Sequence, residues 1–296
     1  MVLASLYSLL LGKMHSSPIF LVQGGLGNQL IQAAMLSFVA NSDLTNIRIN
    51  DHLLNSRIRI IRKVTRRTLS PLLQPNYVCI PQRLLLTARL AARLNLFGKK
   101  LYSDSINNIS LANQRIFTGD GIHPFAFSEA TNMYWTNVVE RLDALCSMNP
   151  VHLPDYVAIH VRKGDYTKRS VQLNTGLYPL PDSYYKRALD LLARVSPISF
   201  HRVKIFTDSP NECSALASSL CLPSEIVCSS SPEQDLFQIS HAKLLILSNS
   251  TFSILGAHLA SIRDKTSISV APHEWFSTPR YNGTRYDLRG VACYTI

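Results

Sequence analysis

The stretch Tyr156-Val-Ala-Ile-His-Val161, which continues into Arg162-Lys-Gly-Asp-Tyr166, decides the fold of this chain. Its apolar first half is typical of a strand, and its charged second half is typical of a turn at a strand end. Because side chains alternate along a strand, we expect His160 and Arg162 on one face. In parallel α/β sheets, ligands bind at the carboxyl ends of the strands. The segment therefore predicts such a sheet, with a polar site at its edge.

Strand–turn–helix units repeat after this segment. The pattern predicts strands over 203–207, 225–228, 243–247 and 267–271, and helices over 182–195, 212–220, 235–242 and 253–263. Asp182 or Ser183 is the expected N-cap of the first of these helices. This alternation indicates a largely parallel sheet covered by helices.

The N-terminal part begins in the same way, with a strand over 19–22, a glycine-rich turn over 23–29 and a helix over 30–40. Another helix is predicted over 82–97, where apolar residues recur at helical spacing. A break in the pattern falls near 147–153. We therefore expect two α/β domains that face one cleft, residues 1–150 and 151–296.

Composition excludes several classes of protein. The chain has 296 residues, of which 46% are hydrophobic and 17% charged, which excludes a disordered or collagen-like chain. No apolar run reaches the roughly 18–20 residues that cross a bilayer. The apolar segment Met1–Leu11 lacks the leading positive charge of a secretory signal. Six cysteines occur without CxxC pairs, and together these features predict a cytoplasmic protein.

The positive charge is concentrated in one region. Between Arg48 and Lys100 there are twelve Lys and Arg residues and one acid, although the whole chain has a net charge of +11. Such a region suits an anionic partner, and a solvated face is the alternative. Only Tyr77 and Phe97 are aromatic there, whereas single-stranded nucleic acid is bound by interleaved aromatic residues. We expect no nucleic acid and favour peripheral contact with the inner face of a membrane.

Three strand ends carry groups that suit a diphosphate. The turn Gly24–Gln29 leads into a helix N-terminus, which attracts anions. Arg162 and Lys163 supply cations, and Asp165 is an available general base or a structural partner of these cations. Hydroxyls crowd the segment Leu247-Ser-Asn-Ser-Thr-Phe-Ser253, where N-capping is the simpler explanation. No DxD-type acidic cluster is present, so together these ends predict a metal-free diphosphate site.

These segments resemble the alpha-1,2-fucosyltransferase family in the correct order from about residue 19 to 275. The turn GGLGNQ begins at Gly24, and His160-Val-Arg-Lys-Gly-Asp-Tyr166 is similar to the family motif HxRRGDY, with Lys163 in place of the second Arg. Leu180–Lys186 and Phe206-Thr-Asp208 also match family segments. The block from Asp235-Leu-Phe-Gln-Ile-Ser240 to SNSTFS at 248–253 completes the resemblance.

The resemblance implies a GT-B fold, with an N-terminal acceptor-side domain and a C-terminal domain that binds a GDP-sugar. It implies inverting transfer of fucose from GDP-fucose to a galactose hydroxyl, with O-2 favoured and with no metal or other cofactor. The acceptor would be a galactose-containing oligosaccharide or a lipid-linked glycan. The implied catalytic residues are Arg162, on the β-phosphate, and Asp165, as base. The implied GDP-fucose-binding residues are Gly25, Asn28, Gln29, His160, Arg162, Lys163, Asp208, Ser250, Thr251 and Phe252.

The chain departs from the family pattern at a few positions. Ser209 replaces a second Asp, and Ile254, Leu255 and His258 stand where the family has tryptophans. The acceptor side matches least. Transfer of fucose to another hydroxyl, or of another GDP-sugar, therefore stays open. A non-enzymatic binder of anionic membranes or nucleic acid is the alternative of a different class.

Overall fold

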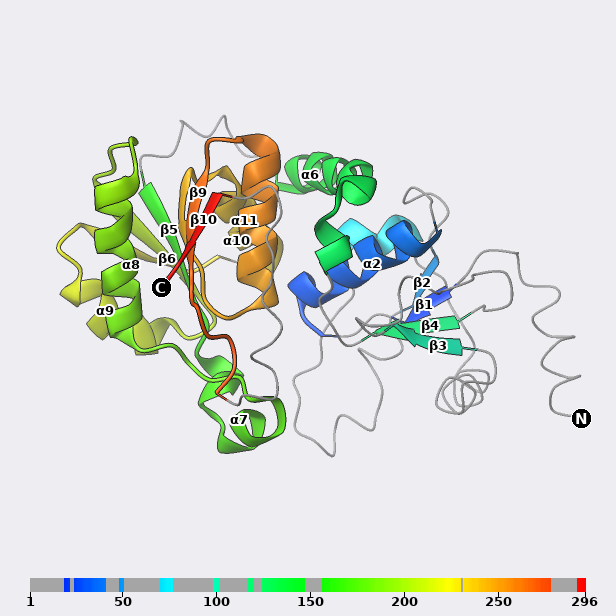
Figure 1. Ribbon diagram of the computed structural model, residues 1–296, viewed down its shortest axis with the longest axis horizontal. Coiled ribbons are helices and arrows are strands. Elements are labelled where there is room, and N and C mark those ends of the chain that lie inside the picture. Colours follow the sequence, from blue (N-terminus) through cyan, green and yellow to red (C-terminus); the bar gives the residue numbers. More distant parts are fainter. Residues whose placement is uncertain are drawn as a thin grey trace, which may run out of the picture.

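A computed structural model describes residues 19–21, 24–40, 48–50, 70–76, 98–101, 116–119, 124–146, 156–229, 231–277 and 292–296. Two parallel sheets organise these residues (Figure 1). The first sheet has the order β2-β1-β4-β3. Its strands are β1 (Ile19–Leu21), β2 (Arg48–Asn50), β3 (Gly98–Leu101) and β4 (Ile116–Gly119).

The second sheet has six parallel strands in the order β10-β9-β8-β5-β6-β7. Counted from β5, this is the 3-2-1-4-5-6 order of a dinucleotide-binding α/β fold. Its strands are β5 (Tyr156–Val161), β6 (Arg202–Thr207), β7 (Ser224–Val227), β8 (Leu244–Ile246), β9 (Ile268–Ala271) and β10 (Ala292–Thr295). The expected α/β class with two parallel, Rossmann-like units is confirmed.

Helices cover both faces of the second sheet. In Figure 1, α8 and α9 lie on its outer face, whereas α10 and α11 lie on the face toward α2, α6 and the first sheet. The helices are α2 (Leu26–Ala40), α6 (Asn132–Cys146), α7 (Arg169–Thr175), α8 (Asp182–Val195), α9 (Ser214–Ser219), α10 (Pro232–His241) and α11 (Thr251–Arg263). Short 3-10 helices are η2 (Pro71–Asn76), η5 (Pro124–Phe127), η6 (Glu129–Thr131), η7 (Gly164–Thr167) and η8 (Pro210–Cys213). Among the described residues, no helix is both long and apolar enough to span a membrane.

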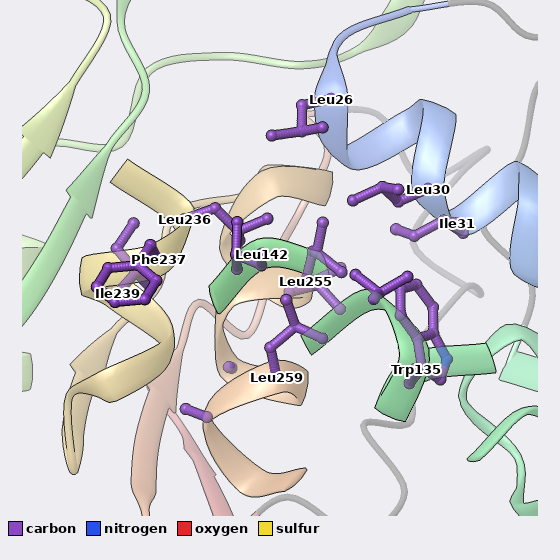
Figure 2. Close-up of a cluster of buried hydrophobic side chains, with 14 of the residues drawn as sticks. Leu26, Leu30, Ile31, Trp135, Leu142, Leu236, Phe237, Ile239, Leu255 and Leu259 are labelled. Carbon is purple, nitrogen blue, oxygen red and sulfur yellow. The ribbon is translucent and has the colours of Figure 1, made fainter. Parts of the chain in front are cut away.

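One apolar core joins helices from both halves of the chain. Figure 2 shows α2, α6, α10 and α11 turning leucine, isoleucine and aromatic side chains toward one another. Leu30, Trp135 and Leu255 are fully buried within it. Burying one such side chain contributes roughly 1.5–3 kcal/mol, so this core fixes the position of α2 against α11. A second core lies between the outer face of the second sheet and α8 and α9.

Several sequence expectations are refined by the structure. Helix α2 begins at Leu26 and not at residue 30, because Gly24 alone makes the turn with a φ of 87° and the amide of Gln29 already bonds to the carbonyl of Gly25. The N-cap of α8 is Pro181, and not Asp182 or Ser183 as the sequence predicts. The carboxylate of Asp182 contacts Lys163 instead.

Other expectations lie outside the described residues. They concern Met1–Leu11, the helix over 82–97, most of the basic region 48–100 and the boundary at 150/151. Helices α6 and α7 and strands β2, β3, β4 and β10 are not among the elements predicted from the sequence. None of the residues of α7 is buried, so it has no apolar stripe that a sequence pattern could reveal.

Candidate active site

The order in which successive strands are added to the second sheet reverses at β5. Strands β6 and β7 extend the sheet to one side of β5, and β8, β9 and β10 extend it to the other. Ligands of open α/β sheets bind in the crevice beyond the carboxyl ends of strands at such a switch point. Arg162 follows β5 directly, and the segment Ser248–Ser250 follows β8. The topology therefore brings two of the three predicted strand ends together.

Arg162 is held from two sides by carboxylates. Its Nη2 lies 2.6 Å from Oδ1 of Asp165, and its Nη1 lies 2.8 Å from Oδ2 of Asp208. The guanidinium also lies 5.3 Å from the ring centre of Tyr166. Burial works against its charge, but Asp208 and then Asp165 outweigh burial and raise the pKa of Arg162. The result is an oriented cation, with a quarter of its side chain still exposed.

His160 is buried beneath this cation and contacts two serines. Its Nδ1 lies 2.9 Å from the hydroxyl of Ser248 and 2.6 Å from that of Ser253. The imidazole also packs against Phe252, with 5.1 Å between ring centres. Burial first, and then the charge of Arg162, lower the pKa of His160 to about 3. His160 is therefore a neutral group at physiological pH.

Two helix N-termini meet beside these residues. Ser250 is the N-cap of α11, and its hydroxyl accepts a hydrogen bond of 3.3 Å from the amide of Phe252. A Cβ on Gly27, in the first turn of α2, would lie only 2.7–2.9 Å from backbone atoms of Thr251 and Phe252. Each N-terminus carries roughly half a positive charge and free N–H groups. Their close approach brings the third strand end, with Gly25 and Asn28, to the other two.

Two predicted binding residues are engaged elsewhere. Lys163 directs its Nζ toward Asp182, at 3.4 Å, and toward the carbonyl of Glu212, at 2.8 Å. Gln29 is 2% exposed and bonds to the carbonyl of Gly24 and the amide of Ser70. The structure therefore does not bring the Lys163 ammonium to Arg162, and it gives Gln29 a part in fixing the glycine turn. Direct contact of either residue with a ligand stays a prediction.

The turn after β5 is fixed by the end of β6. The amide of Lys163 donates to Oδ1 of Asp208, and the amide of Gly164 donates to the hydroxyl of Ser209, at 3.1 and 3.0 Å. A Cβ on Gly164 would collide with the Asp208 carboxylate. Ser209 therefore holds the turn that presents Arg162, although it lacks the second carboxylate of the family pattern.

The residues that position other residues of the site were not identified from the sequence. Ser248, Ser253 and Gly27 lie inside the quoted motifs but received no role, because a buried serine or glycine has no chemistry of its own that a pattern would reveal. Their spacing did hold a signal: Ser248 and Ser253 flank a helix start, so both hydroxyls turn back toward β5.

The substituted tryptophan positions face the core and not the site. Ile254 and Leu255 are fully buried in the core shared by α2, α6 and α11. His258 packs edge-on to Phe127 and Trp135, with ring centres 4.8 and 5.2 Å apart. These side chains occupy the interior, so the departures are accommodated by packing.

No group of three or more His, Cys, Asp or Glu side chains is placed to hold a metal ion within the described ranges. The basic region 48–100, which the sequence analysis assigns to the acceptor side, lies mostly outside those ranges. The metal independence and the acceptor therefore stay predictions.

Comparison with known proteins identifies the family. The model of glycosyl transferase family 11 matches residues 137–287. An alpha-1,2-colitosyltransferase of Escherichia coli is 26% identical over 277 residues, and the match covers 88% of this chain and 92% of that protein.

The similar solved structures are more distant in sequence. The chain is 11% identical to POFUT1 in complex with GDP-fucose, with a TM-score of 0.42 and coverage of 86% of this chain and 97% of that one. It is 12% identical to NodZ alpha-1,6-fucosyltransferase soaked with GDP-fucose, with a TM-score of 0.45 and coverage of 82% and 93%. With the heptosyltransferase WaaC of E. coli, it shares 12% identity, a TM-score of 0.41 and coverage of 94% and 92%. The family match, which spans half of the chain and includes two of the three strand ends, shows that this chain belongs to glycosyl transferase family 11, the fucosyltransferase family that its motifs resemble.

Proposed function

We propose that this protein transfers fucose from GDP-fucose, with inversion, to O-2 of a galactose-containing glycan. Membership of glycosyl transferase family 11 supports glycosyl transfer. The observation that carries the donor is that the N-termini of α2 and α11 meet, with Phe252 packed against His160, two residues before Arg162, at one switch point. Two anion-binding helix ends beside a guanidinium suit the two phosphates of a nucleoside diphosphate.

Arg162 is the group that stabilises the departing GDP. Negative charge grows on the β-phosphate oxygen as the bond to the sugar breaks, and a fixed cation lowers the energy of that state more than of the ground state. The guanidinium has five N–H donors. Two of its nitrogens contact Asp165 and Asp208, so N–H groups remain for a diphosphate. Ser250 and Thr251 add the start of α11 to the same phosphates.

Asp165 is the proposed base for the acceptor hydroxyl. Its Oδ1 is bonded to Arg162, and 38% of its side chain is exposed, so the carboxylate lies at the open side of the cluster. We also assign it the role of orienting the guanidinium. Loss of Asp165 then disturbs both proton transfer and GDP stabilisation, whereas loss of Asp208 disturbs only the latter.

We propose a cytoplasmic enzyme held near the inner face of a membrane by the basic region 48–100, where a lipid-linked glycan would be presented. Its twelve cations against one acid support this placement. Vesicles rich in anionic lipid should bind the protein at low salt and release it at high salt. If they fail to bind it at low salt, the membrane contact is wrong and a soluble oligosaccharide is the better acceptor.

Transfer of another sugar from GDP is the second candidate, and one observation favours it. The curated relative is named for colitose and not for fucose. The direct assay offers GDP-fucose, GDP-mannose and GDP-linked colitose in turn with galactose-terminated acceptors, and then determines the product linkage by mass spectrometry and NMR. Product from GDP-fucose alone, linked to O-2, supports the proposal; product from another donor or at another hydroxyl replaces it.

The donor site is tested without an acceptor. Calorimetric titration with GDP in EDTA should show binding, and Arg162→Ala should weaken it about 10- to 150-fold, which corresponds to the loss of a charged contact of about 1.5–3 kcal/mol. Arg194→Ala is the matched control, because Arg194 is exposed and, among the described residues, its side chain bonds to the carbonyl of Asp190 within α8. Absence of GDP binding by the folded protein would refute the donor site and favour a non-enzymatic anion binder.

A further inference from the structure

The buried serines around His160 form a closed set of hydrogen bonds. The hydroxyls of Ser248 and Ser253 lie 3.0 Å from each other, and both contact Nδ1 of His160. The amide of Ser248 donates to the hydroxyl oxygen of Ser253 at 3.1 Å. Both serines are fully buried and His160 is 8% exposed. Within the described residues, these atoms have only one another as partners.

The protons of this set can be counted. If Nδ1 carries no proton, it accepts from the Ser253 hydroxyl, and the Ser253 oxygen accepts from both the hydroxyl and the amide of Ser248. Every donor then has an acceptor. If Nδ1 carries the proton, one of the two serine hydroxyls has no acceptor left, and a buried donor without a partner is costly.

We infer that Ser248 and Ser253 are positioning residues that hold His160 in the neutral tautomer with its proton on Nε2. His160 then offers an uncharged N–H donor, next to the charged Arg162, at the carboxyl end of β5. The depressed pKa of His160 agrees with this neutral state. That the acceptor of this N–H is an atom of the bound nucleotide rests on the proposed function; the tautomer itself does not.

The geometry also ranks the two serines. Ser253 is the nearer donor to Nδ1 of His160. Its hydroxyl donates to Nδ1, and its oxygen accepts from the amide and the hydroxyl of Ser248. Ser248 can replace it as donor to Nδ1 at 2.9 Å. One substitution therefore leaves a donor on Nδ1, whereas Ser248→Ala combined with Ser253→Ala removes both and frees the ring to adopt either tautomer.

Nitrogen-15 NMR of the imidazole rings in the free protein tests the tautomer. The chain has nine histidines, and the signals of His160 are those lost in His160→Gln. We expect an unprotonated Nδ1 and a protonated Nε2 in the wild type and in each single variant, and a mixture of tautomers in the double variant. A protonated Nδ1 in the wild type would overturn the inference.

GDP titration of the same proteins tests the consequence. The double variant should bind GDP about tenfold more weakly, the loss expected for one misdirected hydrogen bond. Ser261→Ala is the matched control, since Ser261 is a buried serine of the same helix whose hydroxyl bonds to the carbonyl of His258. A double variant with mixed tautomers but unchanged GDP affinity would overturn the claim that the Nε2–H group of His160 binds the nucleotide. Absence of GDP binding by the wild type would refute the proposed function and leave the tautomer measurement valid.

Discussion

Gly27 is the position at which one methyl group should separate the two anion-binding helix ends. A Cβ there would lie 2.7 Å from the amide nitrogen of Phe252, whereas ordinary contact begins at 3.4 Å. The obstructing atoms belong to the backbone of α11 and cannot rotate away. Gly27→Ala must therefore move α2 from α11 by about 0.7 Å, which is the difference between these two distances.

We expect Gly27→Ala to have two effects that can be measured separately, one on the free energy of unfolding and one on the affinity for GDP. Overpacking costs roughly 1–3 kcal/mol of folding free energy, from which about 1 kcal/mol is recovered because alanine favours a helix. A phosphate that bonds to both helix ends cannot follow both after the shift. The lost part of one charged hydrogen bond, about 1.5 kcal/mol, corresponds to roughly tenfold weaker GDP binding.

Thermal unfolding and GDP calorimetry on one preparation measure both parts. Gly256→Ala is the matched control, because Gly256 also lies in a helix and its added methyl would meet only the side chain of Ile239. We expect that control to change stability and to leave GDP affinity as it is. Wild-type GDP affinity in a folded Gly27→Ala protein would refute the claim that both helix ends address one diphosphate.

Three further predictions concern stability. His258→Phe should stabilise the protein by about 1 kcal/mol in urea titration, because both ring nitrogens of His258 are buried without a partner in the part of the chain that the structure describes and the aromatic contacts are kept; destabilisation would mean that the imidazole has a partner after all. Burial lowers the pKa of both His160 and His258 to about 3. Below pH 6.5 these two histidines are protonated in the unfolded chain but stay neutral in the folded chain, so the free energy of unfolding should fall from pH 6.5 toward pH 3. Each histidine should lower the folding constant by up to tenfold per pH unit. His258→Phe should make this pH dependence less steep. Arg263 contacts Asp143 at 2.5 and 3.0 Å and joins α11 to α6; because Asp143 is partly exposed, a double-mutant cycle should give a coupling of only about 1 kcal/mol, and no coupling would show that the apolar core alone holds the two helices.

The second sheet could be predicted from sequence because its signals are local. Strand β5 and helix α8 occupy the predicted ranges, since each combines an apolar pattern with a clear terminus. Strand β10 could not be predicted, because an edge strand of four residues is defined by its partner β9 and not by its own pattern. The start of α2 differs from the predicted residue 30 for a related reason: a single residue with positive φ, Gly24, completes the turn, and Gly27 lies within the helix.

The charged residues of the site could be predicted from the sequence, but the residues that hold them in position could not. The charges of Arg162 and Asp208 can be read from the sequence, and the order of the strands brings the two side chains together. Adjacency in the sequence predicts that Lys163 lies beside Arg162, but the chain leaves β5 after Val161 and enters a 3-10 turn at Lys163, whose ammonium contacts Asp182 and Glu212 instead. The sequence gives the charge of each side chain, whereas the direction in which the side chain points depends on the fold.

The site and the core share one scaffold, and this has a consequence for variation in the chain. Helix α11 presents Ser250 at its first turn and buries Leu255 and His258 further along. The same core holds α2, whose start carries Gly27. A substitution that loosens this core therefore separates the two helix ends without touching either of them. The replacements at Ile254, Leu255 and His258 preserve a filled interior, so on this argument they are compatible with an intact donor site.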